Sequence, residues 1–119
     1  MARLIPAGRE DREDATAFTG RVARWDSAGP IRLRADGELV RMWATTPFDT
    51  LVTRAVRGTV QPSDVTVHAG NLLAALAVAR DDEVDPGPAI DAAWRSQLPP
   101  PQGWVTVDAV PATVLAALA

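Results

Sequence analysis

Residues 31–42 alternate apolar and charged side chains around a two-residue turn signal, and this pattern constrains the fold more than any other stretch. The alternation has the two-residue period of a β-strand, whose successive side chains point to opposite faces of a sheet. Asp36 and Gly37, between the two runs, are typical of a type I′ hairpin turn. We therefore expect an antiparallel hairpin of residues 31–35 and 38–45, with one apolar face and one charged face.

The turn sets the expected register of this hairpin. With Asp36 and Gly37 as the turn residues, Arg32 lies directly opposite Arg41. Residues 18–26 are expected to add a third strand, which completes a meander. The apolar face then collects the four residues Ile31, Leu33, Val40 and Met42.

Residues 47–57 can be interpreted in two ways. Thr46 as N-cap, Pro47 in the first turn and Asp49 in a capping box favour a helix. The β-branched residues of the segment favour a fourth strand instead. The helix is the preferred interpretation, because its capping signals agree with one another.

The second half of the chain is expected to be mainly helical. One short strand, residues 65–67, precedes a largely apolar helix over residues 69–80. A loop follows, and then a second helix in which Ile90, Trp94 and Leu98 form one stripe. The expected elements after residue 80 are a loop at 81–88, a helix at 89–98, extended prolines at 99–101, a strand at 104–107 and a helix from Pro111.

Strands followed by helices predict an α+β fold. The expected architecture is a small antiparallel sheet, an N-terminal three-stranded meander with a fourth strand as the alternative, and C-terminal helices packed on one face. Residues 1–16 contain a mixed charge run and are expected to be a mobile tail, which leaves residues 17–119 as a single domain. The helical pattern that continues to Ala119 suggests the front part of a longer protein.

The residue types that are missing exclude several classes of function. The chain has no cysteine, one histidine and no lysine, since all 12 basic residues are arginine. Thiolate chemistry, Cys-based zinc sites, Schiff-base lysines and the P-loop motif are therefore excluded. We expect no cofactor and no metal, and the composition argues against an enzyme. A hydrolytic enzyme that uses carboxylates is the one alternative still considered among enzymes.

No membrane segment is expected. The longest apolar run, residues 72–79, is far shorter than the ~20 residues that span a bilayer. The N-terminus lacks the apolar stretch of a signal peptide. A cytoplasmic location is therefore the expectation.

Two further segments resemble functional sites only superficially. Residues 81–87 carry acids at alternate positions like a calcium loop, but Pro86 stands where the turn glycine of an EF-hand belongs. We expect a solvated loop there, in which Asp85 caps the following helix. His68 follows Ser63 and Asp64 closely, but no nucleophile elbow accompanies them, so His68 is expected to be an ordinary residue at the strand–helix boundary.

The charged face of the meander is the strongest candidate for a binding surface. If Val22 lies beside Leu33, the third strand adds one arginine and one tryptophan to that face. Two arginines directly opposite each other repel, so a negative group is expected to offset them. The candidate binding residues are Arg21, Trp25, Arg32, Arg34, Arg41 and Trp43.

The preferred interpretation of this face is a non-catalytic interaction module that docks an acidic protein partner or a second copy of the chain. Trp and Arg are common hot spots in protein interfaces. Single-stranded nucleic-acid binding is the alternative, although the net charge of −3 weighs against it. The protein's own acids are a further source of neutralising charge, because residues 61–119 carry seven acids and two arginines.

Overall fold

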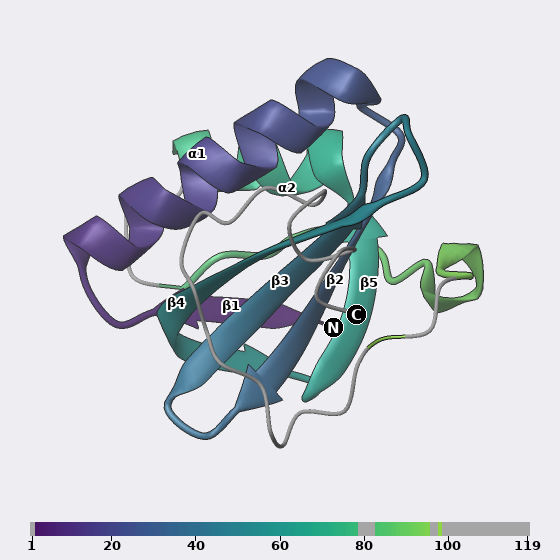
Figure 1. Cartoon of the computed structure of the whole chain (residues 1–119). Helices are drawn as coiled ribbons and strands as arrows, with labels where there is room; N and C mark the ends of the chain where they lie inside the picture. Colours follow the sequence, from purple (N-terminus) through teal and green to yellow (C-terminus); the bar gives the residue numbers. More distant parts are fainter. Residues whose placement is uncertain (1, 79–82, 96–97, 99–119) are drawn as a thin grey trace.

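A computed structural model describes residues 2–78, 83–95 and 98 of the chain (Figure 1). Within these residues the strands form one five-stranded antiparallel sheet of order β1-β4-β3-β2-β5. Both α-helices lie on the same face of this sheet. The elements are β1 (Arg3–Pro6), α1 (Arg9–Trp25), β2 (Pro30–Asp36), β3 (Leu39–Thr45), β4 (Leu51–Gln61), β5 (Asp64–His68), α2 (Ala69–Val78) and a 3₁₀ turn, η1 (Asp91–Ala93).

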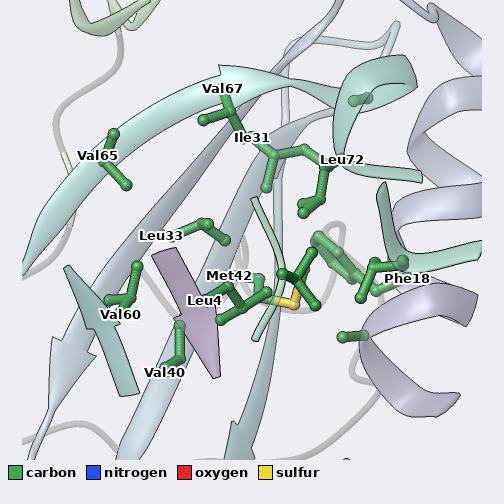
Figure 2. Packing of buried hydrophobic residues seen from close by; sticks show 14 of the residues in the cluster. Leu4, Phe18, Ile31, Leu33, Val40, Met42, Val60, Val65, Val67 and Leu72 are labelled. Atoms are coloured by element: carbon green, nitrogen blue, oxygen red, sulfur yellow. The ribbon is translucent and has the colours of Figure 1, made fainter. Parts of the chain in front are cut away.

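The α+β class with an antiparallel sheet is confirmed, but the strand count and the helix packing differ from the prediction. The sheet has five strands rather than three or four, and one of the two helices precedes most of the sheet instead of following it. The alternation of β2 and β3 produces the core as predicted, because Ile31, Leu33 and Met42 are completely buried between the sheet and the helices (Figure 2).

The β2–β3 hairpin has a different register from the expected one. Asp36 pairs with Leu39, so the turn residues are Gly37 and Glu38, and Gly37 has a φ of 61°. One left-handed glycine in the first turn position is typical of a type II′ turn, whereas type I′ needs two left-handed residues. The shift amounts to two residues, so each side chain keeps its face while its partner across the sheet changes.

The expectation of a mobile tail at residues 1–16 and a strand at 18–26 was wrong. These residues form β1 and α1. Four buried residues of α1 follow the i, i+3, i+4, i+7 spacing of a helix face, and they are Ala15, Phe18, Thr19 and Val22. Thr19 is accommodated because its hydroxyl donates a hydrogen bond of 2.7 Å to the Ala15 carbonyl.

The preferred helix at residues 47–57 was also wrong, and the alternative, a strand, is present as β4. Thr46 does cap backbone groups, but the groups belong to a hairpin turn. Its Oγ1 accepts hydrogen bonds from the amides of Phe48 (3.2 Å) and Thr50 (3.3 Å), and Asp49 adopts a left-handed φ of 64°. The same side-chain acceptor serves a helix start and a turn, so the capping signal did not discriminate between them.

In the second half of the chain, β5 confirms the strand at residues 65–67. Helix α2 confirms the helix that begins at Ala69, as far as residue 78. Of the helix expected at 89–98, the described residues 89–95 and 98 form only the short turn η1. The elements expected after residue 98 lie outside the described residues.

Residues 83–91, which we call the closing segment, contact both edges of the sheet. Val84 exchanges two backbone hydrogen bonds with Leu4 of β1, of 2.9 and 2.7 Å. At the opposite edge the amide of Ile90 donates to the Thr66 carbonyl of β5 at 2.7 Å. One segment therefore satisfies backbone groups on both outer strands.

We expect Leu33→Ala to destabilise the fold by about 2–5 kcal/mol, because Leu33 is fully buried in the core and its truncation leaves a cavity. Urea-induced unfolding measures the change. Phe48→Ala removes a larger side chain that is 87% exposed, and this control should change stability by no more than about 0.5 kcal/mol. Equal effects of the two substitutions would contradict the described core.

Candidate functional site: the outer sheet face

Four of the six candidate binding residues lie together on the sheet face that points away from the helices, which we call the outer face. Arg32 and Arg34 come from β2, and Arg41 and Trp43 come from β3. In register, Arg32 lies opposite Trp43, and Arg34 lies opposite Arg41. The two-residue shift of the hairpin thus pairs Arg34, and not Arg32, with Arg41.

The other two candidates are not on the sheet. Arg21 and Trp25 belong to α1, which packs on the opposite face, so their assignment to the charged sheet face was wrong. Arg21 is exposed on the helix, and Trp25 is 38% exposed in its last turn. The error follows directly from the strand that we expected at residues 18–26.

A carboxylate from β5 neutralises Arg32. Arg32 donates from Nε to Asp64 Oδ1 at 2.8 Å and from Nη2 to Asp64 Oδ2 at 2.7 Å. This two-bond geometry matches the planar fork of guanidinium to a carboxylate. The hydrogen bonds from Arg32 lower the pKa of Asp64 from its ordinary value, and the same interaction raises the pKa of Arg32. Asp64 is therefore held in its ionised form.

The remaining two arginines differ in how well they are neutralised. Arg41 pairs with Asp36 at 3.1 Å, and only 11% of its side chain is exposed. Arg34 approaches Asp64 Oδ2 with its Nε at 3.7 Å, which is beyond hydrogen-bonding distance. Arg34 makes no hydrogen bond from its side chain to the described residues. Since it also faces Arg41, it is the least compensated cation of the outer face.

Trp43 is only 3% exposed, although it points away from the helices. In register it lies between Arg32 of β2 and Thr53 of β4. A buried indole contributes packing, but it cannot present a ring face to a nucleic-acid base. The stacking role considered for Trp43 therefore lacks an accessible surface.

A pocket of about 260 Å³ opens beside the Arg32–Asp64 pair. It is lined by Arg32, Asp64, Thr66, Asp91 and Trp94. Asp91 is the first residue of η1 and Trp94 directly follows this turn, and the amide of Thr66 donates to Asp91 Oδ1 at 2.8 Å. Asp91 was not among the residues expected at a site, and Trp94 was expected on a helix stripe that the described residues do not form. Two residues that are three positions apart lie on the same side of a 3₁₀ turn. Such a spacing is too common to be recognised in a sequence.

Asp64 and His68 are the titratable side chains of β5 that bear on a catalytic role. A carboxyl group that acts as a general acid needs a raised pKa, and the pKa of Asp64 is lowered. His68 Nδ1 lies 3.1 Å from the Ala28 carbonyl at the end of β5. Within residues 2–78, 83–95 and 98, no cluster of three or more metal-ligating side chains is present.

In the described part of the acidic loop, two carboxylates form ion pairs with the N-terminal strand. Arg3 of β1 pairs with Glu83 at 2.8 Å and with Asp85 at 3.3 Å. Asp85 also accepts a hydrogen bond from the Gly87 amide at 3.1 Å, which forms a turn rather than the expected helix cap. These acids anchor the closing segment.

The chain belongs to a family described as a domain of unknown function, DUF8010, whose model matches residues 1–96. The matched range contains all residues of the outer face and of the pocket. A comparison with curated proteins gave no match, and a comparison with solved structures gave none.

Neither α1 nor α2 is long and apolar enough to cross a membrane, and the same holds for every helix in the described part of the chain.

We expect Asp64→Asn to reduce stability at neutral pH by about 0.2–1 kcal/mol, because this partly exposed pair is screened by solvent. The pKa of Asp64 is lower in the folded than in the unfolded chain, so its contribution is present above the ordinary value of 3.8 and is lost as the pH falls through the native pKa. Urea unfolding of both proteins over a pH series should show the difference shrinking in acid. A difference that stays constant down to the lowest pH would contradict this assignment.

Proposed function

We propose that this domain is a non-catalytic interaction module whose outer face docks an acidic segment of a partner protein. The observation that supports the proposal is the incomplete neutralisation of the Arg34 charge. Its guanidinium lies opposite a second arginine and forms no hydrogen bond with the described residues, while 29% of its side chain is exposed. A carboxylate from a partner would supply the missing counter-charge.

The electrostatics of β2 favour an incoming carboxylate at Arg34. Asp64 already accepts two hydrogen bonds from Arg32, so its oxygens are committed. Asp36 is likewise engaged by Arg41. An Asp or Glu of a partner can form a two-bond pair with Arg34 and at the same time relieve its repulsion with Arg41.

The internal ion pairs limit what the face can bind. Because Arg32 and Arg41 have acids of their own, the face does not present three open cations to a polyanion. Single-stranded nucleic acid, the alternative, relies on phosphate neutralisation and base stacking. A single under-compensated arginine beside a buried tryptophan supports an acidic peptide better than a nucleic acid.

We expect a glutamate-rich peptide to bind the wild-type protein, and Arg34→Gln to weaken this binding at least about fivefold, as for an interface arginine worth about 1 kcal/mol. Titration calorimetry at low ionic strength measures the affinity, and added salt should reduce it. Arg21→Gln is the matched control, since it removes the same charge from the exposed surface of α1.

The proposal fails if the peptide does not bind, or if Arg21→Gln and Arg34→Gln weaken binding equally. Two parallel measurements test a second copy of the chain and a nucleic acid as alternative binding partners. A concentration-dependent molecular mass that Arg34→Gln abolishes would identify a second copy as the occupant instead. Salt-sensitive binding of a single-stranded oligonucleotide that exceeds peptide binding would overturn the preference for a protein partner.

A further inference from the structure

We infer that the pocket between β5 and η1 binds a planar cation of the guanidinium class. This inference is separate from the acidic partner proposed above, because the groups that would hold the ligand are Asp91 and Trp94 rather than Arg34, and the ligand has the opposite charge. The pocket combines one carboxylate that has no direct ion-pair partner among the described residues with one indole ring. These two groups together recognise a flat cation.

The charges in the pocket do not cancel. Arg32 and Asp64 form a closed pair with two hydrogen bonds, and this pair is neutral as a whole. Asp91 is the other carboxylate in the lining, and it forms no direct ion pair with the described residues, although its charge also attracts Arg32. The pocket therefore carries a net charge close to −1 and favours a cation over an anion or a neutral ligand.

Asp91 is held in position while one of its oxygens stays open. Oδ1 accepts the hydrogen bond from the Thr66 amide at 2.8 Å, and this contact fixes the carboxylate against β5. Among the described residues, Oδ2 has no hydrogen-bond donor. A carboxylate that is fixed by one oxygen and open at the other can accept a hydrogen bond from a ligand without being reordered.

Trp94 supplies a wall of the same pocket. The Trp94 amide donates to the Asp91 carbonyl at 3.2 Å, which closes one turn of 3₁₀ geometry. In a 3₁₀ turn, side chains three residues apart lie above one another, so the indole and the carboxylate share one side of η1. A guanidinium that stacks on the indole can direct its N–H groups in the ring plane toward Asp91 Oδ2.

The size of the pocket selects a small group. A volume of about 260 Å³ accommodates the head of one side chain or a small free ligand, but not a folded surface. The planar shape of guanidinium fits beside an indole better than a tetrahedral ammonium does. Two sources have this chemistry, namely an arginine side chain of a partner and a free small molecule.

The test uses N-acetyl-argininamide as the probe and two-dimensional NMR of the full chain as the readout. We expect saturable binding with a Kd on the order of 1 mM and a shift of the Trp94 indole N–H signal. Tetramethylammonium, a cation without N–H donors, should bind at least about tenfold more weakly.

Asp91→Asn is the decisive variant, because the amide oxygen can still accept the bond from Thr66 while the charge is lost. We expect this variant to keep its unfolding temperature and to lose binding of the probe about tenfold or more. Asp49→Asn is the matched control, since it removes the same charge at a turn position where Asn tolerates the left-handed φ of 64°.

Arg34→Gln should not weaken probe binding, because it removes a positive charge near Asp64 and leaves Asp91 and Trp94 in place, and this separates the inference from the proposed acidic partner. Equal binding of the probe by wild type and Asp91→Asn, or tetramethylammonium binding as tightly as the probe, would overturn the inference. A short peptide with one arginine that binds at least tenfold tighter than N-acetyl-argininamide identifies a partner side chain as the source. Equal affinities identify a free small ligand.

Discussion

The two-residue alternation of β2 and β3 is the constraint on which the rest of the structure depends. β3 is the central strand of the sheet, and its neighbour β2 repeats the same pattern. Because successive side chains point to opposite faces, the apolar residues that receive α1 and α2 also force Arg32, Arg34 and Arg41 to the other face. The hydrophobic core and the cationic surface are two consequences of one pattern.

Ion pairs with neighbouring acids then determine where positive charge remains on the outer face. The sheet order places β5 beside β2, and this neighbour brings Asp64 within reach of Arg32 and Arg34. One carboxylate cannot satisfy two guanidinium groups fully, so the face keeps a local excess of positive charge at Arg34. On the other side of β5, Asp91 adds a negative charge that attracts Arg32 but forms no direct ion pair with the described residues. Two small regions of opposite charge thus lie on either side of one closed ion pair.

The sequence predicted those parts of the structure in which local pattern and tertiary packing agree. The faces of β2 and β3 survived an error in the register, because a shift of two residues does not exchange faces. Helix α1 was missed because its buried stripe includes Ala15 and Thr19, which carry a weak apolar signal. The capping chemistry of Thr46 is shared by helices and turns, so it could not decide the conformation of β4. The pocket depends on a long-range contact between Thr66 and Asp91, and no local spacing encodes such a contact.

The closing segment is hydrogen-bonded to both outer strands of the sheet, so its detachment would affect both sheet edges together. It pairs with Leu4 on β1 and with Thr66 on β5, so its detachment would uncover unpaired amides and carbonyls on both outer strands simultaneously. A molecule opened in this way could accept a strand from one neighbour and donate its opposite edge to another, which is the geometry of open-ended fibrous assembly. Residues 83–91 therefore cover part of both sheet edges, and the ion pairs of Arg3 with Glu83 and Asp85 help to hold them in place.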